Sequence, residues 1–430
     1  GVHDSTSIPP TASSQTLGLM MFVSIGTIGG DVVASFFAEP TWGIHEVHCA
    51  IRKQAEPSRA RLRMRLFHEM AELTRDSTLA DVGVADGSRL TVFWLSPWLV
   101  ATGSADCTAK IWSLETGECL LTLGDHYGFV CSAAFSPNAA QLLTTSNDCI
   151  ARLWCSTSGQ CIHTLYGHGG VITSAAFSHD GARLLTASAD GTARIWSATS
   201  GYCLQSLEGH GGMVCVAVFS PNTIQVLTGS DDHTARIWRT EYGDCLHTLE
   251  GHEHQVCAVA FSPSAARVVT ASNDCTARVW CSTSGLCIWT LWGHGFWVRA
   301  AVFSPDGVQV LTASRDSTAK LWCSETGECL HTIQDTRHRV CSAIFSPDGD
   351  KVLTTSDDKA VRTWSATSGE YLQTLHSEHV TCSAVFTTDG THFLTVAKDH
   401  IAKVWCAESG QCICTLDGHH DAMSCVAFST

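Results

Sequence analysis

Eight tryptophans recur at nearly constant spacing along the last three quarters of the chain. Six of the seven intervals are 42 residues long and the last is 41. A constant period of this length indicates a repeat protein, in which each unit buries its apolar residues against its neighbours. The eight residues are Trp112, Trp154, Trp196, Trp238, Trp280, Trp322, Trp364 and Trp405.

Each repeat unit contains four short β-rich runs bounded by turn residues, with no room for a helix. Four strands per unit predict one blade of a β-propeller. A Gly follows every one of the eight tryptophans by five residues, and an Asp precedes each by six. Gly suits a tight turn with positive φ, and Asp accepts hydrogen bonds from the amides of its own turn.

These units resemble the WD-repeat propeller family over residues 98–430. In that family the Trp, a Thr ten residues before it, the turn Asp and the His of a Gly-His pair form a hydrogen-bonded structural tetrad. The resemblance implies six complete tetrads: Thr102, Asp106, Trp112, His419; Thr144, Asp148, Trp154, His126; Thr186, Asp190, Trp196, His168; Thr228, Asp232, Trp238, His210; Thr270, Asp274, Trp280, His252; and Thr312, Asp316, Trp322, His294.

The sequence departs from the family pattern at several positions. Thr336 and Ser377 stand where the tetrad His is expected, although His338 and His379 follow two residues later. The Asp that usually follows the Trp is replaced by Ser, Cys or Arg. These departures weaken individual blades rather than the prediction of the fold.

The number of innermost strands predicts how the ring closes. Their pattern occurs seven times between residues 129 and 386, and once more at residues 423–429, where it has no unit of its own. The first unit, residues 99–123, lacks this strand. We therefore expect a mainly β fold, an eight-bladed propeller closed by the C-terminal strand, which leaves no unpaired sheet edge.

Residues 20–96 lack the period and follow a ββαββ order. The expected elements are strands at 21–28, 31–37, 62–67 and 89–95 and a helix at 44–54. This order, and above all residues 77–93, resembles a ubiquitin-like domain, a small α+β (β-grasp) fold. The resemblance implies that Phe67, Thr91 and Phe93 form its apolar recognition patch, the alternative being that they fill the core. Residues 1–19, rich in Ser, Thr and Pro, are expected to form a flexible arm.

Composition narrows the classes of function. The 22 cysteines fall mostly at repeated positions without a CxxC pair, so we expect small buried apolar residues, no metal site and a reducing compartment. The cytoplasm is the expected location, with the nucleus left open. GxSxG, HExxH and GxxxxGK are absent, which predicts no enzyme and no cofactor. A net charge of -15 makes nucleic acid an unlikely partner, and no apolar run is long enough to span a membrane.

One group of residues is not explained by the repeat. Twelve residues after the Trp most units have a polar residue or Gly, whereas one has Trp292. Two large aromatic residues follow, where other units have Gly170, Gly212 or Gln255, and four arginines lie close by in this and the next unit. Exposed aromatic residues beside Arg are typical of protein-binding hot spots. We call this group the binding sector: Trp292, Phe296, Trp297, Arg299, Arg315, Arg337 and Arg339.

The sequence therefore favours a non-enzymatic scaffold for protein–protein interactions with a monomeric propeller. The expected partner is an acidic segment with an apolar anchor, because the sector combines positive charge with aromatic surface. A role as a substrate adaptor in the ubiquitin system rests on the resemblance alone. Two alternatives stay open, a phospho-peptide or nucleic-acid reader that uses the Arg cluster, and a hydrolase or lyase that uses the propeller channel.

Overall fold

The computed structural model describes residues 20–27, 31–54, 63–69, 71–73, 78–95, 98–334, 338–397 and 399–429. The chain divides into two compact units, Gly1–Pro97 and Trp98–Thr430. Among the described residues, no helix is long and apolar enough to cross a membrane.

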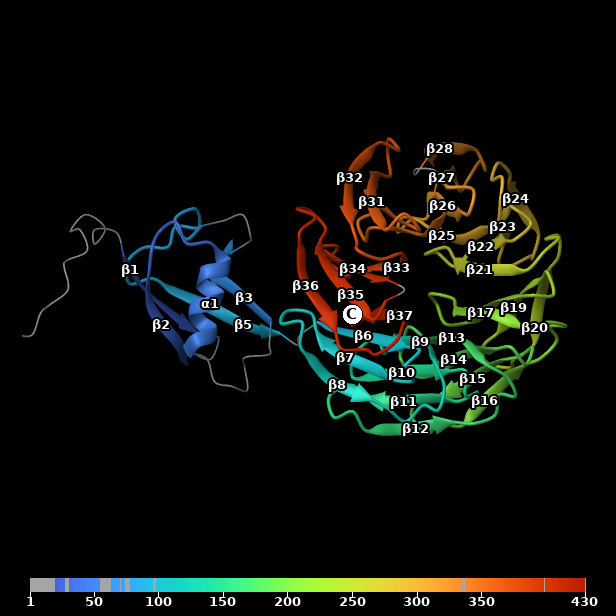
Figure 1. Cartoon of the computed structure of the whole chain (residues 1–430), viewed down its shortest axis with the longest axis horizontal. Helices are drawn as coiled ribbons and strands as arrows, with labels where there is room; N and C mark the ends of the chain where they lie inside the picture. The colour runs from blue at the N-terminus through green and yellow to red at the C-terminus, as the bar shows by residue number, and fades with distance from the viewer. Residues whose placement is uncertain are drawn as a thin grey trace, which may run out of the picture. The chain divides into compact units, whose positions relative to one another are not determined.

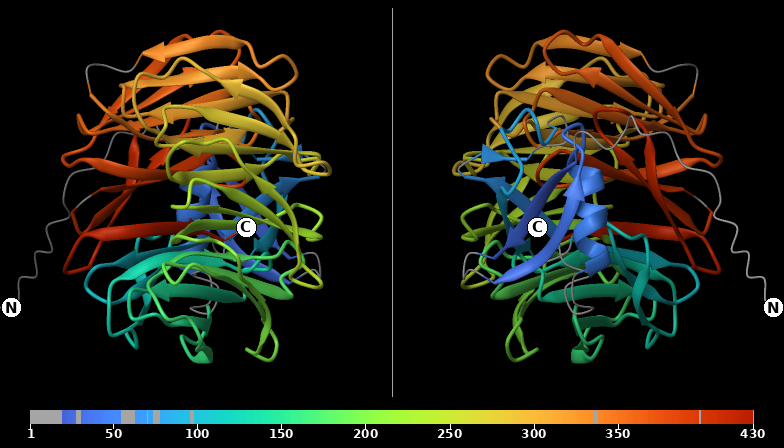
Figure 2. Two further views of the ribbon diagram at one scale, coloured as in Figure 1. Left: turned by 90° about the vertical axis from the view of Figure 1, so that its right-hand side faces the viewer. Right: turned by 90° about the vertical axis from the view of Figure 1, so that its left-hand side faces the viewer.

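The strands described in the second unit form eight four-stranded antiparallel sheets arranged in a ring (Figure 1). Seen edge-on, the ring has loops along two opposite faces (Figure 2). We number the sheets as blades and give their strands from the inside outward. Blade 1 has β37 (Met423–Phe428), β6 (Leu99–Ser104), β7 (Ala109–Ser113) and β8 (Cys119–Leu123); blade 2 has β9 (Val130–Phe135), β10 (Gln141–Ser146), β11 (Ala151–Cys155) and β12 (Cys161–Leu165); blade 3 has β13 (Ile172–Phe177), β14 (Arg183–Ser188), β15 (Ala193–Ser197) and β16 (Cys203–Leu207); blade 4 has β17 (Val214–Phe219), β18 (Gln225–Ser230), β19 (Ala235–Arg239) and β20 (Cys245–Leu249).

The remaining four blades repeat this order. Blade 5 has β21 (Val256–Phe261), β22 (Arg267–Ser272), β23 (Ala277–Cys281) and β24 (Cys287–Leu291); blade 6 has β25 (Val298–Phe303), β26 (Gln309–Ser314), β27 (Thr318–Cys323) and β28 (Cys329–Gln334); blade 7 has β29 (Val340–Phe345), β30 (Lys351–Ser356), β31 (Ala360–Ser365) and β32 (Tyr371–His376); blade 8 has β33 (Thr381–Phe386), β34 (His392–Ala397), β35 (Ile401–Cys406) and β36 (Cys412–Asp417).

The C-terminal strand β37 closes the ring, as the sequence predicts. It pairs antiparallel with β6, with Val426 opposite Thr102. Beyond the strand, the Ser429 N–H donates to the Leu99 carbonyl at 2.8 Å, and the Leu99 N–H donates to Ser429 Oγ at 2.8 Å. The prediction of an eight-bladed ring closed by its tail is therefore confirmed.

The apolar core of the propeller lies between neighbouring blades. Trp238 of blade 4, which is 1% exposed, belongs to one cluster with Leu185 and Ile195 of blade 3. A blade therefore cannot bury its Trp by itself, and each sheet depends on its neighbours for stability.

The first unit is a mixed sheet with one helix. Its elements are β1 (Met21–Gly26), β2 (Val32–Ala38), α1 (Ile44–Gln54), β3 (Arg63–His68), β4 (Ala71–Glu72) and β5 (Arg89–Leu95). The strand order is β2-β1-β5-β3-β4, and β1 and β5 are parallel while the other pairs are antiparallel.

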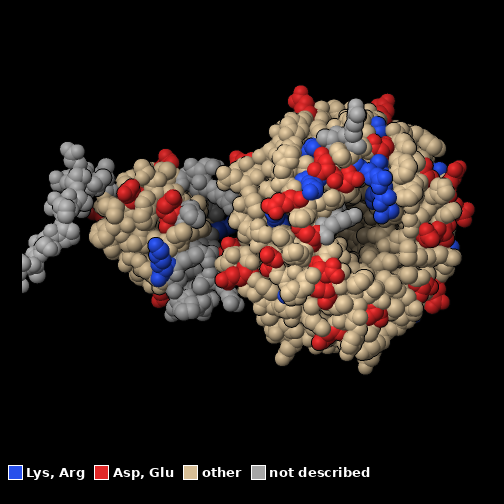
Figure 3. All heavy atoms as spheres, viewed as in Figure 1, with Lys and Arg blue, Asp and Glu red and all other residues tan. Residues whose placement is uncertain are grey.

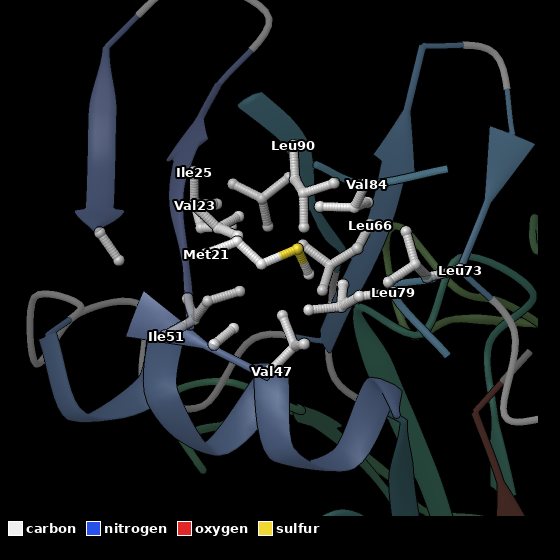
Figure 4. Close-up of a cluster of buried hydrophobic side chains, with 13 residues drawn as sticks. Met21, Val23, Ile25, Val47, Ile51, Leu66, Leu73, Leu79, Val84 and Leu90 are labelled. Carbon is white, nitrogen blue, oxygen red and sulfur yellow. The ribbon is translucent and has the colours of Figure 1, made fainter. Parts of the chain in front are cut away.

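The helix of the first unit contributes to a small buried core. Gly43 precedes the helix, and its N–H donates to Glu46 Oε2 at 3.1 Å, which satisfies one amide at the helix start. Val47 and Ile51, four residues apart on one face of α1, meet Val23 and Leu66 from the sheet in the core (Figure 4).

The expectation that the repeated cysteines are buried is wrong: among the described residues the other repeated cysteines are half-buried, and those that begin the outermost strands are exposed. Their side chains are exposed because the fourth strand of each blade lies at the rim of the ring, where one sheet face meets solvent. These residues are Cys119, Cys161, Cys203, Cys245, Cys287, Cys329 and Cys412.

Candidate protein-interaction site

Each tetrad joins the loop before the innermost strand of a blade to the turn between its second and third strands, so both lie on the same face of the propeller. In blade 6, His294 lies in the loop before the innermost strand, and its Nε2 is 2.8 Å from Thr312 Oγ1. Its Nδ1 is 3.0 Å from Asp316 Oδ2, in the turn between the second and third strands. The Trp322 indole N–H donates to the same Thr312 hydroxyl at 2.8 Å.

The other five tetrads make the same three contacts. Their members are Thr102, Asp106, Trp112 and His419; Thr144, Asp148, Trp154 and His126; Thr186, Asp190, Trp196 and His168; Thr228, Asp232, Trp238 and His210; and Thr270, Asp274, Trp280 and His252.

The tetrad environment favours ionised Asp and neutral His. Burial opposes ionisation of Asp190, but hydrogen bonds from the Thr192 hydroxyl, the Gly169 N–H and His168 outweigh it and lower the pKa of Asp190 to about 2. Burial also lowers the pKa of the His168 imidazole below its usual value. The pKa of the tetrad His moves in the same direction in blades 1, 2 and 4.

These shifts predict that the propeller loses stability as the pH falls. A His with a lowered native pKa stays neutral in the fold while the unfolded chain binds protons, so this loss begins below about pH 6.5. An Asp with a lowered native pKa stabilises the fold above about pH 4, and this contribution disappears as the pH falls toward the native pKa. We expect the urea midpoint of unfolding to be level near neutrality, to decline from about pH 6.5 and to fall more steeply below about pH 4. A urea midpoint that stays constant from neutrality into this acid range would contradict the assignment of neutral His and ionised Asp in the tetrads.

In blade 7 an arginine contacts the turn Asp. Arg362 Nη1 and Nη2 contact the two carboxylate oxygens of Asp358 at 3.3 and 2.5 Å, and both side chains are nearly buried. His338 does not substitute, because it is largely exposed and lies 3.7 Å from Asp357 instead. Thr336 lies outside the described residues.

In blade 8 the histidine two residues later does reach the turn Asp. His379 Nε2 lies 3.3 Å from Asp399 Oδ2.

Arg362, which contacts the turn Asp of blade 7, belongs to a series that was not recognised from the sequence. A Lys or Arg stands two residues before the Trp of every unit. The series is Lys110, Arg152, Arg194, Arg236, Arg278, Lys320, Arg362 and Lys403.

The aromatic residues of the binding sector are held outward by a fixed loop. His294 is 8% exposed, whereas Trp292, Phe296 and Trp297 around it are 69%, 42% and 38% exposed. The Ser314 hydroxyl donates to the Phe296 carbonyl at 2.9 Å. The backbone N–H of Arg315 donates to the Trp297 carbonyl at 3.0 Å. A ligand that binds here therefore has little loop ordering to offset.

An arginine lies over the aromatic pair of the sector. Phe296 and Trp297 stack with ring centroids 5.1 Å apart and planes at 30°. The Arg315 guanidinium carbon lies 5.1 Å from the centre of the Trp297 ring, within cation–π range. The three side chains form one platform that is apolar and positively charged.

Two further arginines of the sector are exposed on blades 6 and 7. Arg299 lies on β25, and Arg339 directly precedes β29 of the next blade. In the part of the chain that the structure describes, neither forms an ion pair, nor does Arg315; the backbone N–H of Arg339 donates to Asp357 at 2.9 Å. Figure 3 shows basic side chains gathered beside the central hollow of the propeller. Arg337 lies outside the described residues.

The position of Trp297 is apolar in several other blades, contrary to the expectation from sequence. The carbonyl of the third residue after the tetrad His accepts the N–H of the residue before the turn Asp, and Phe129, Val171 and Met213 make this contact as Trp297 does. Phe129 is 53% and Val171 37% exposed. Trp297 is thus the largest residue at a position that is apolar in several blades, although Gln255 and Arg339 make the same contact in two others.

The residues expected to form the ubiquitin-like patch lie on the sheet of the first unit. Phe67 of β3 is directly opposite Thr91 of β5. Their strand neighbours Leu66 and Val92 are buried in the core, so Phe67 and Thr91 face the other side of the sheet. Both are half-buried, and the side chain of Phe93 lies outside the described residues.

Comparison with known proteins identifies the repeats. A family model described as WD domain, G-beta repeat, matches residues 90–113, 117–155, 159–197, 201–239, 243–281, 285–323, 327–365 and 369–406. Nuclear distribution protein PAC1 of Mycosarcoma maydis is 51% identical over 45 residues, which are 10% of this chain and 10% of that protein. WD repeat-containing protein 37 of Homo sapiens is 41% identical over 64 residues, which are 15% of this chain and 13% of that protein. The matched region is thus a small part of each relative.

Proposed function

Because the chain belongs to the WD-repeat family, we propose that it is a non-enzymatic scaffold whose protein ligand binds at the binding sector. WD-repeat proteins generally act as scaffolds for other proteins. One observation carries the assignment to the sector: three exposed aromatic side chains lie on a fixed loop, and Arg315, which has no ion pair within the described residues, lies over one of them.

The chemistry of the sector favours an acidic ligand segment with an apolar anchor. Arg315 covers one side of Trp297 and repels a cationic ligand, while the stacked rings offer a surface to an apolar side chain. Residues 98–430 contain 18 Lys and Arg against 31 Asp and Glu, so a positive sector contrasts with the rest of the propeller. Such local charge steers an acidic partner toward this place.

A phospho-peptide would use the same arginines, and nucleic acid is the remaining alternative. Nucleic-acid binding releases many counterions and therefore weakens steeply with salt, whereas an apolar anchor depends little on salt. The salt dependence of binding thus separates nucleic acid from a peptide ligand with an apolar anchor.

We further propose that the first unit is a ubiquitin-like domain, which would make the whole chain an adaptor in ubiquitin-dependent turnover. The strand order β2-β1-β5-β3-β4, the parallel central pair and the single helix support this proposal. Its half-buried pair Phe67 and Thr91 would contribute to contacts with the ubiquitin system. In this proposal the propeller holds the substrate in the cytoplasm or nucleus.

The test uses a random 15-residue peptide library displayed on phage and selected on the immobilised full chain. We expect the wild type to enrich peptides that combine Asp or Glu with a large apolar residue. Trp297→Ala with Arg315→Ala removes the platform, and recovery of these peptides should fall by about tenfold or more, a loss of about 1.4 kcal/mol of binding free energy.

The matched control removes a similar stack elsewhere. The Arg239 guanidinium carbon lies 5.5 Å from the Tyr242 ring centre, in the turn after β19, at the opposite strand ends from the Trp297 loop. Tyr242→Ala with Arg239→Ala should leave recovery unchanged. Equal losses in both folded variants, or full recovery by the sector variant, would refute the proposed site.

A further inference from the structure

The contact between neighbouring blades has a second layer, far from the tetrads. The third residue of each outermost strand packs against the turn between the third and fourth strands of the next blade. A Cβ on the turn residue Gly201, which has φ +72°, would lie 2.8 Å from the His163 ring of the preceding blade. His163 Nε2 also lies 2.9 Å from the Thr199 carbonyl in that turn. We call this contact, together with the first residue of the preceding blade's second strand, the seam.

The turn residue of the seam varies together with the preceding blade. Three residues after the Trp, four blades have Thr and four have Glu. Every Glu faces a blade whose second strand begins with a basic residue or His, and every Thr faces one that begins with Gln or Leu. The Glu seams are Arg183 with Glu241, Arg267 with Glu325, Lys351 with Glu408 and His392 with Glu115; the Thr seams are Leu99 with Thr157, Gln141 with Thr199, Gln225 with Thr283 and Gln309 with Thr367.

The outermost strand follows the same division. Three of the four Thr seams have His at its third position, and none of the Glu seams does. The Thr seams have Leu121, His163, His247 and His331, and the Glu seams have Gln205, Trp289, Gln373 and Cys414. Three positions that are distant in sequence but adjacent in the ring therefore change together.

The structure shows the contacts at one seam of each type, and at the Glu seam they depend on the side chain of the turn residue. At the Glu seam between blades 5 and 6, Arg267 Nη2 is 2.9 Å from Glu325 Oε1, and Nη1 donates to the Ser324 carbonyl at 2.7 Å. At the Thr seam between blades 6 and 7, Gln309 Nε2 donates to the Ala366 carbonyl at 3.5 Å, and His331 Nε2 is 2.9 Å from the Thr367 carbonyl.

A mixed seam would lose the ion pair that matches the two sides of the Glu seam. The Arg267 side chain is only 26% exposed, so Thr in place of Glu325 would leave a half-buried cation without this carboxylate. Conversely, Glu in place of Thr367 would face Gln309, which carries no positive charge. Mismatch of this kind selects between otherwise similar interfaces.

We propose that the two seam types are self-selecting interfaces that fix which blade packs against which. Each blade flank then accepts a neighbour of its own seam type and rejects a neighbour of the other type. From the seam between blades 2 and 3 to the seam between blades 7 and 8, the Thr and Glu types alternate, so packing of each blade against the next but one would mismatch most seams. The proposal concerns assembly of the ring and does not depend on the proposed function.

Charge reversal at the seam between blades 5 and 6 tests this proposal. Arg267→Glu and Glu325→Arg each create a like-charge pair, so each should lower the urea midpoint and raise the oligomeric fraction after refolding, measured by size exclusion with light scattering. The double reversal restores an opposite-charge pair and should recover both values. Glu250→Arg, a charge reversal at an exposed position in the loop after β20, on the opposite face from the seams, should change neither.

A second variant converts the seam to the other type. Arg267→Gln, Trp289→His and Glu325→Thr together should keep the wild-type midpoint and the wild-type oligomeric fraction, whereas Glu325→Thr alone should lower the midpoint. Single reversals that match the wild type in both measurements would overturn the proposal. So would a double reversal that recovers neither value, or a triple variant less stable than Glu325→Thr alone.

Discussion

Removal of residues 423–430 is expected to abolish cooperative unfolding of the propeller. The deletion takes away β37, the innermost strand of blade 1, and with it the pairing to β6. Every residue of β6 is buried, so its edge would become an exposed template for pairing with other chains. We expect loss of the single thermal transition and aggregation, followed by calorimetry and light scattering.

Removal of residues 1–19 is the control for a shortened chain. These residues lie outside the described residues and outside the repeats, and their loss should leave the transition unchanged. A chain without residues 423–430 that still melts in one transition at the wild-type temperature would contradict the closure argument.

Asp358→Ala in blade 7 is expected to cost more stability than Asp190→Ala in a complete tetrad. Asp190→Ala leaves neutral hydrogen-bond groups short of one partner, which costs about 1–3 kcal/mol of unfolding free energy. Asp358→Ala takes away the carboxylate that two nitrogens of Arg362 contact, and breaking a nearly buried ion pair costs about 3–5 kcal/mol. Urea unfolding of the two variants measures both values.

A double variant separates the charge effect from general damage. Asp358→Leu with Arg362→Met replaces the pair by apolar side chains and should recover much of the stability lost by Asp358→Ala. A smaller cost at Asp358 than at Asp190 would mean that the ion pair does not replace the tetrad His.

The repeat explains why much of the fold could be predicted. The same turn residues recur in eight copies, so chance matches to the pattern are excluded. The Gly after each Trp and the surplus strand at residues 423–429 were sufficient to predict a closed ring. The role of Arg362 could not be predicted in this way. A basic residue occurs at its position in every unit, and only the fold brings this one onto the two oxygens of Asp358.

The binding sector was found because the repeat provides its own comparison. Trp292 and Phe296 differ from their counterparts in other units, and the structure leaves both exposed. The stacking of Arg315 on Trp297 could not be read from sequence, because it depends on how the loop lies against the turn of the same blade. The exposure of the cysteines that begin the outermost strands was not predicted either. The repeat period shows that these residues are equivalent, but it does not show whether their strand lies at the rim or in the core.

Hydrogen exchange of the full chain, with and without a peptide selected from the library, tests the central claim most directly. If the ligand binds at the binding sector, the amides of the loop at 292–299 and the turn at 313–317 should exchange more slowly in the complex. The turn at 239–244 should exchange at the same rate with and without peptide. Protection confined to that turn or to other blades, with no change at 292–299, would contradict the account.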